Sequence, residues 1–102
     1  MRIRCAVQFG MKSIMQSDKV CYICARTVGL EKHHVFAGVA NRRISEREGL
    51  WVWLCHNCHT GKEGAQYNKD KNLFLKMDAQ YQYERNHTRQ EWMKLIGKNY
   101  LS

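Results

Sequence analysis

The pattern of apolar and polar positions predicts two short strands in the first half of the chain. The run LWVWL at 50–54 is continuously apolar and rich in aromatic and β-branched residues, which is typical of a buried strand. A second strand is expected over HHVFA at 33–37. The segment between them, 38–49, is polar, basic and bounded by glycines, so we expect a loop there with one helical turn over 45–48.

Helical periodicity begins after the second expected strand. Gly61 and Gly64 limit any helix that follows this strand to one or two turns. A longer helix is expected from Asn68 onward, because apolar residues recur there at helical spacing. The residues expected to form its core-facing stripe are Leu73, Phe74, Met77 and Tyr81.

A final short helix is expected near the C-terminus. Thr88 begins the sequence TRQE, in which Glu91 completes a capping box. Gly97 is expected to end this helix. Its apolar face comprises Trp92, Leu95 and Ile96.

Composition and charge narrow the classes of protein that fit this pattern. The 102 residues suit one small domain, and the formal net charge of +8 favours a polyanionic partner, with nucleic acid foremost. A basic protein without such a partner is the alternative. The first 18 residues form a poorly patterned leader with no sustained apolar stretch, so we expect no signal peptide, no membrane span and a cytoplasmic location.

The five cysteines include two C-x-x-C pairs, Cys21/Cys24 and Cys55/Cys58, which are separated by 30 residues. Two such turns direct four thiolates at one ion, and zinc prefers a closed tetrahedral site of this kind. We therefore predict a structural Zn²⁺ site, with an iron–sulfur cluster as the alternative. Cys5 lies outside the pattern and is expected to be a free thiol.

Four histidines close to these cysteines, His33, His34, His56 and His59, have no role in that zinc site. Phosphodiester hydrolysis requires a base that activates water and a divalent cation that stabilises developing charge. Adjacent strand residues point to opposite faces, so one of His33 and His34 is free to bind an ion while the other acts as the base. The alternative is that His33 and His34 are surface residues and that His56 and His59 are spare zinc ligands.

Several of these stretches together resemble a known family. The strings CYIC, EKHHVFAG and NRRISEREGLWVWLCHNCH, with the ending TRQEWMKLIGKNYL, are similar to the HNH endonucleases, and most of all to a small phage and prophage subset. The resemblance covers Met11 to Leu101. It implies an α+β fold with a ββα-metal (His-Me finger) core, a treble-clef-like zinc site and C-terminal helices. Residues 1–10 would then be an extension of a single domain at 11–102.

The resemblance also implies the role of each candidate residue. His34 would be the general base, and His33 and His59 would hold a catalytic Mg²⁺ or Mn²⁺ ion, with His56 exposed. The family usually has an asparagine that orients the base, but only Asn41 stands nearby and it lies too early in the segment for a clear assignment. Relatives in the subset often carry a histidine where this chain has Gln66, so Glu63 and Gln66 are alternatives for a third ligand.

The expected function is metal-dependent cleavage of DNA in a bacterial host cell by a phage or prophage product. Arginine suits phosphate contacts, and the segment between the two strands is rich in it. A zinc-stabilised nucleic-acid-binding module and a zinc-scaffolded regulatory or inhibitor module are the alternatives. The expected DNA-contacting residues are Arg42, Arg43 and Arg47.

Overall fold

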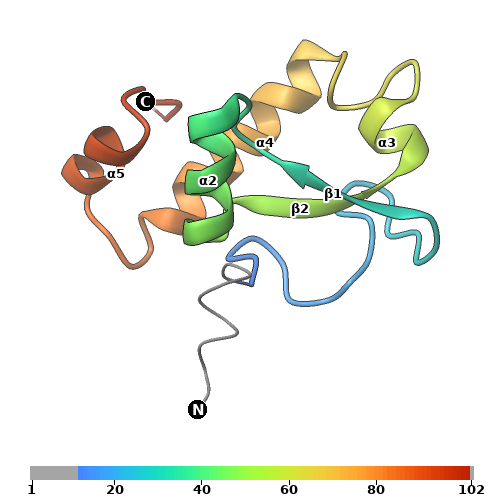
Figure 1. Cartoon of the computed structure of the whole chain (residues 1–102), viewed down its shortest axis with the longest axis horizontal. Helices are drawn as coiled ribbons and strands as arrows, with labels where there is room; N and C mark the ends of the chain where they lie inside the picture. Colours follow the sequence, from blue (N-terminus) through green and yellow to red (C-terminus); the bar gives the residue numbers. More distant parts are fainter. Residues whose placement is uncertain (1–11, 102) are drawn as a thin grey trace.

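The computed structural model describes residues 12–101, and this part of the chain is a small α+β fold (Figure 1). Residues 1–10, including Cys5, lie outside the described residues, so the predictions made for them stay predictions. The elements in chain order are β1 (Leu30–His34), α2 (Val39–Glu48), β2 (Trp51–Cys55), α3 (His56–Thr60), α4 (Lys69–Tyr83) and α5 (Arg89–Leu95).

The two strands form an antiparallel sheet in which Leu30 pairs with Cys55 and His34 pairs with Trp51. The expected second strand over 50–54 is therefore confirmed with a shift of one residue. The first strand begins three residues earlier than expected and ends at His34. Val35 and Phe36, which were assigned to that strand, instead follow it and are buried in the core.

The prediction of a loop over 38–49 was wrong, because α2 is a helix of ten residues. Most residues of its sequence VANRRISERE tolerate or favour helix, and proline is absent from the chain. The predicted helical turn over 45–48 was shorter than α2 because the apolar stripe of this helix is weak. Gly49 ends α2 in the left-handed conformation, with φ 74°, and its N–H bonds the carbonyl of Ser45.

The segment immediately before the first C-x-x-C pair covers the free edge of β2. Ser13 Oγ donates to the carbonyl of Trp51 at 2.5 Å, and the N–H of Trp53 donates to Oε1 of Gln16 at 2.6 Å. The N–H of Tyr22 then donates to the carbonyl of Trp53 at 2.8 Å. The described part of the expected leader is thus a structured cover that satisfies polar groups which an exposed edge strand would leave open.

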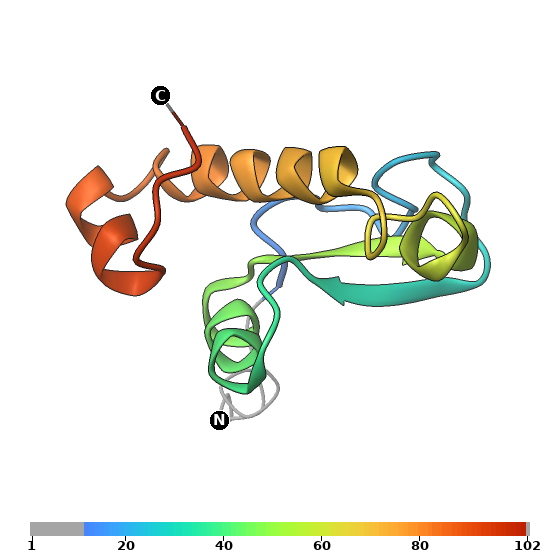
Figure 2. The ribbon, with the colours of Figure 1, turned by 90° about the horizontal axis from the view of Figure 1, so that it is seen from above.

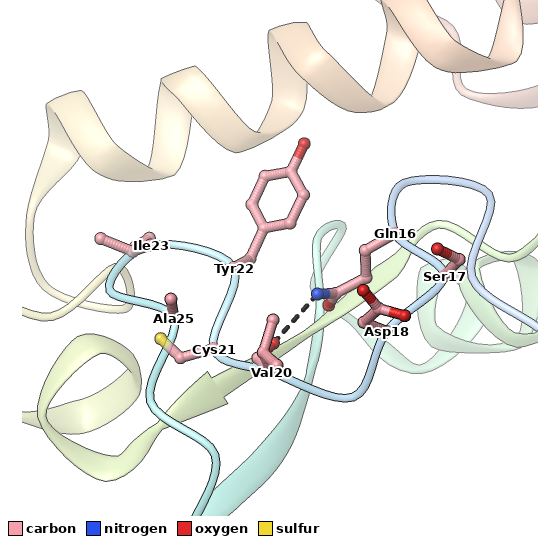
Figure 3. A pocket seen from close by; sticks show the side chains of 8 residues that line it. All are labelled: Gln16, Ser17, Asp18, Val20, Cys21, Tyr22, Ile23 and Ala25. Carbon is pink, nitrogen blue, oxygen red and sulfur yellow. Dashed lines mark hydrogen bonds between the residues drawn. The ribbon is translucent and has the colours of Figure 1, made fainter.

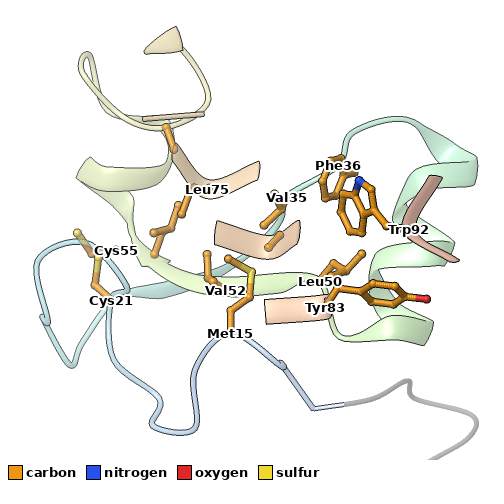
Figure 4. Packing of buried hydrophobic residues seen from close by; sticks show 13 residues of the cluster. Met15, Cys21, Val35, Phe36, Leu50, Val52, Cys55, Leu75, Tyr83 and Trp92 are labelled. Atoms are coloured by element: carbon orange, nitrogen blue, oxygen red, sulfur yellow. The ribbon is translucent and has the colours of Figure 1, made fainter. Parts of the chain in front are cut away.

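Helix α4 runs alongside the sheet, on the side opposite to α2 (Figure 2). It packs through Leu75, Ala79 and Tyr83, which contact the buried residues of β2 and of the segment after β1 (Figure 4). The predicted core stripe was wrong. Helix α4 turns the neighbouring face toward the sheet, so the four residues predicted to face the core are 40–59% exposed. These residues are Leu73, Phe74, Met77 and Tyr81.

Helix α5 confirms the capping box and the expected apolar face. Thr88 Oγ1 accepts from the N–H of Glu91, and the Glu91 carboxylate accepts from the N–H of Thr88. Trp92 is fully buried, and its ring lies 5.5 Å from the rings of both Phe36 and Tyr83. Within residues 12–101, no helix has the length and apolar character needed to cross a membrane.

Candidate functional site

The four cysteines of the two C-x-x-C pairs meet at one end of the sheet. Cys21 and Cys24 come from the loop before β1, Cys55 ends β2, and Cys58 lies in α3. Their sulfur atoms all lie within 4.8 Å of one another, and the Sγ atoms of Cys24 and Cys55 are 3.6 Å apart. Zn–S bonds of about 2.3 Å imply about 3.8 Å between sulfurs in a tetrahedron. The four cysteines therefore fit a metal ion such as zinc.

The local environment prepares one of these thiols for deprotonation. Burial raises the pKa of Cys21, but backbone hydrogen bonds from Cys24, Cys55 and Ile23 outweigh it and lower the pKa to about 6. Burial raises the pKa of Cys58 above its usual value, and hydrogen bonds with the neighbouring thiols add to this effect. A bound cation offsets such a penalty because it stabilises the thiolates directly.

The cysteine loop is also tied to α4. Figure 3 shows Tyr22 pointing from this loop toward the helix, and its hydroxyl donates to Oδ2 of Asp78. Burial raises the pKa of Asp78. Gln16 donates to the carbonyl of Val20 beside the same loop, at 2.9 Å. These bonds connect the cysteine end of the sheet to helix α4 and to the segment around Gln16.

His33 lies on the face of β1 that is turned toward α3. It is 8% exposed, and its Nε2 atom has no hydrogen-bond partner among the described residues. Its ring meets the ring of His59 edge-on, with centroids 5.0 Å apart. Burial, together with the charges of His59, His34 and Lys76, lowers the pKa of His33 to about 4. A buried neutral imidazole with a free nitrogen is in the form that binds metal ions.

Glu31 orients the second histidine of this pair. Its Oε1 accepts from Nδ1 of His59 at 2.7 Å, and its Oε2 lies 3.2 Å from Nδ1 of His56. These hydrogen bonds lower the pKa of Glu31. A carboxylate on one ring nitrogen leaves the other nitrogen for a metal ion, as in carboxylate–histidine–metal arrangements. Glu31 was not among the residues predicted from the sequence, although strand alternation places it on the same face as His33.

The structure does not place the side chain of Glu63 or Gln66, the two candidates for a third ligand, beside His33 and His59. Helix α3 ends at Thr60, so Glu63 does not continue its face, and its carboxylate accepts from the side-chain amide of Asn68 at 3.2 Å. Gln66 is exposed, and its backbone N–H donates to the carbonyl of His59. Across residues 12–101, the four cysteines are the only group of three or more His, Cys, Asp or Glu close enough to share an ion.

His34 lies on the opposite face of β1, where α2 supplies its partner. Nε2 of His34 is 2.6 Å from Oε2 of Glu46, and Nζ of Lys32 is 3.1 Å from the same oxygen. Burial raises the pKa of Glu46, but the hydrogen bonds from His34 and Lys32 outweigh it, so the net shift is downward. Asn41 is exposed on α2. Glu46 was not among the residues predicted from the sequence, because a loop was expected where α2 lies.

The three candidate DNA-contacting arginines are exposed on α2. Arg42 lies four residues before Glu46 and therefore on the same side of the helix. Arg43 and Arg47 are likewise four residues apart, and Arg47 pairs with Glu48 at 3.1 Å. Helix α2 therefore carries both the partner of His34 and a row of guanidinium groups beside it.

Comparisons with known proteins identify no relative: no family model, no curated protein and no solved structure matches this chain.

Proposed function

We propose that this protein is a metal-dependent DNA endonuclease of the HNH type. The observation that carries the proposal is the buried Nε2 atom of His33, which lacks a partner among the described residues and belongs to a ring that faces His59. An unpaired polar atom in a buried position is unfavourable unless a bound ion, a ligand or a water molecule satisfies it. In the proposal, β1, β2 and α3 form the ββα-metal core, and the cysteines hold a structural zinc.

His33 and His59 are the residues that would hold a catalytic Mg²⁺ or Mn²⁺ ion. They would act as imidazole ligands of the ion, and their ring centroids lie 5.0 Å apart. When bound, the ion supplies charge stabilisation at the scissile phosphate. Glu31 holds the ring of His59 through its Nδ1 atom and so prepares this ligand before any ion arrives.

His34 is the proposed general base. When its Nε2–H donates to Glu46, the Nδ1 atom keeps its lone pair and can accept a proton from water. Glu46 also stabilises the imidazolium that results, because it is a carboxylate in direct contact with the ring. Arg42, Arg43 and Arg47 would hold the DNA backbone beside α2.

The test is nicking of supercoiled plasmid DNA by the zinc-loaded protein with added Mg²⁺ or Mn²⁺. Reactions without added ion and reactions with His34→Ala are the controls. We expect open circles that depend on both the ion and His34. If nicking is absent for single-stranded, duplex and branched DNA, or is equal in wild type and His34→Ala, the nuclease proposal is wrong.

One observation favours a second candidate, a zinc-stabilised nucleic-acid-binding or regulatory module without efficient cleavage. Glu63 is engaged by Asn68, so His33 and His59 form a two-residue donor set among the described residues. DNA binding without nicking, unchanged by His33→Ala, would support this candidate.

A further inference from the structure

A basic pocket lies between α4 and the C-terminal segment, and none of the arginines of α2 lines it. Its volume is about 390 Å³. No acidic side chain lines it. The residues that line it are Gln66, Tyr67, Asn68, Lys69, Asn72, Leu73, Lys76, Lys98 and Tyr100.

Three lysines give this pocket a concentrated positive charge. Lys69 and Lys76 come from α4, and Lys98 comes from the segment after α5. None of the three forms a salt bridge within the described part of the chain, whose ion pairs lie elsewhere. Because no carboxylate lines the pocket, the charge of the three lysines there favours a polyanion.

Two tyrosines accompany the lysines in different ways. Tyr67 is 65% exposed at the pocket, so its ring is accessible to a planar ligand. Tyr100 is partly buried, and the Nζ atoms of Lys98 and Lys76 lie 5.3 and 5.8 Å from its ring centre. An accessible aromatic ring beside lysines is the combination that proteins use for single-stranded nucleic acid, where the ring stacks on a base and the cations contact phosphates.

The wall formed by the C-terminal segment is held in place by partly buried hydrogen bonds. Gln80 is fully buried in α4; its Oε1 accepts from the N–H of Tyr100 at 2.6 Å, and its Nε2 donates to Asn99 at 2.8 Å. The indole N–H of Trp92 donates to the carbonyl of Lys98 at 2.8 Å. The pocket is therefore preformed on this side, which reduces the ordering cost of binding.

The pocket adjoins the histidine pair of the proposed nuclease. Gln66, at its edge, is bonded through its N–H to the carbonyl of His59 at 3.0 Å. His59 in turn has its ring centroid 5.0 Å from that of His33. A strand that occupies the pocket would thus continue toward His33 and His59.

We infer that this pocket binds single-stranded DNA, with one base stacked on Tyr67 and the phosphates on either side of that base contacted by Lys69, Lys76 and Lys98. The choice of DNA rests on the proposed function. A single strand is favoured over a duplex because a base must leave the helical stack before its face can meet Tyr67. The proposed nuclease would then act on a strand that is already unpaired beside the scissile phosphate.

The experiment is fluorescence anisotropy of a labelled oligothymidylate of twelve nucleotides, titrated with the full-length zinc-loaded chain without added Mg²⁺ or Mn²⁺. Tyr67→Ala should weaken binding about 5- to 150-fold, the range for loss of one stacked base. Tyr67→Phe should bind like wild type, because stacking does not need the hydroxyl. Tyr81→Ala is the matched control: Tyr81 is 59% exposed on α4 and does not line the pocket.

The lysines are tested through the salt dependence of the same binding. Combined Lys69→Gln, Lys76→Gln and Lys98→Gln should reduce the slope of log K against log salt by about 0.7 for each lost phosphate contact. Lys94→Gln, at an exposed position of α5, should leave the slope unchanged. Circular dichroism and zinc content verify that each variant is folded.

The possible outcomes separate this inference from the proposed nuclease. The pocket inference is overturned if Tyr67→Ala binds like wild type, if Tyr81→Ala weakens binding equally, or if a duplex of the same length binds more tightly than the single strand. Binding that depends on Tyr67 in a protein that never nicks DNA would support the pocket and reject the nuclease. Nicking by a protein whose DNA binding does not depend on Tyr67 would support the nuclease and reject the pocket.

Discussion

The carboxylate of Glu46 lies 2.6 Å from Nε2 of His34, although the two residues are twelve positions apart and belong to different elements. We expect Glu46→Ala to lower kcat on the order of 100-fold with little change in KM, because the proposed base loses its orienting partner and a misplacement of about 1 Å can cost this much. Glu46→Gln should lose less, since the amide oxygen still accepts the N–H of His34.

Steady-state cleavage of labelled DNA measures this effect. Glu48→Gln is the matched control, because Glu48 is in the same helix but pairs with Arg47. Equal losses in the Glu46 and Glu48 variants would mean that the effect comes from α2 as a whole and not from the contact with His34.

The histidine variants should differ in how far added Mn²⁺ restores their cleavage rate. His34→Ala should lose about 10²–10⁴-fold in cleavage rate, because the proposed general base is removed, and more Mn²⁺ should not restore it. His33→Ala and His59→Ala should weaken ion binding, so raising Mn²⁺ should restore part of their activity. The measurement is cleavage rate against ion concentration, with the exposed His56→Ala as control. Rescue of His34→Ala by Mn²⁺ would contradict its assignment as the base.

Gln66→His tests whether this position can serve as a ligand. Its N–H is bonded to the carbonyl of His59, so a new imidazole would start close to α3. If the side chain reaches the ion, cleavage should rise at low Mn²⁺ and converge with wild type at high Mn²⁺. Gln66→Ala provides the comparison, and equal rates for both variants at every ion concentration would exclude a ligand role.

One zinc ion per chain is expected from the four cysteines. Because structural zinc supplies on the order of 10 kcal/mol to small domains, Cys55→Ser with Cys58→Ser should unfold much of this one. Elemental analysis and circular dichroism of the purified proteins measure both effects. A folded wild-type protein with almost no zinc, or a double variant that keeps its full zinc content, would refute this prediction.

The inward face of α4 can be tested with two leucines two positions apart. Leu75 is fully buried and Leu73 is 46% exposed. Leu75→Ala should lower the free energy of unfolding by about 2–5 kcal/mol, whereas Leu73→Ala should cost less than about 1 kcal/mol. Urea denaturation followed by circular dichroism gives both values. Similar costs for the two variants would indicate that α4 packs differently.

Local features of this chain could be predicted from its sequence because neighbouring residues determine them. A C-x-x-C turn directs two thiolates at one point, and the structure brings both turns together. The capping box of Thr88 and Glu91 is equally local, since all its partners lie within one helical turn. The apolar run around Trp51–Cys55 predicts a buried strand because it is short and rich in aromatic and β-branched residues, which are enriched in strands.

Only the tertiary structure decided which face of α4 is buried and which carboxylates meet the histidines. Helical periodicity allows two apolar stripes on α4, one through Leu73 and one through Leu75, and only contact with the sheet selects between them. Glu31 and Glu46 reach His59 and His34 across 28 and 12 positions. Such contacts depend on how helices pack against the sheet, and nothing in the adjacent sequence encodes that arrangement.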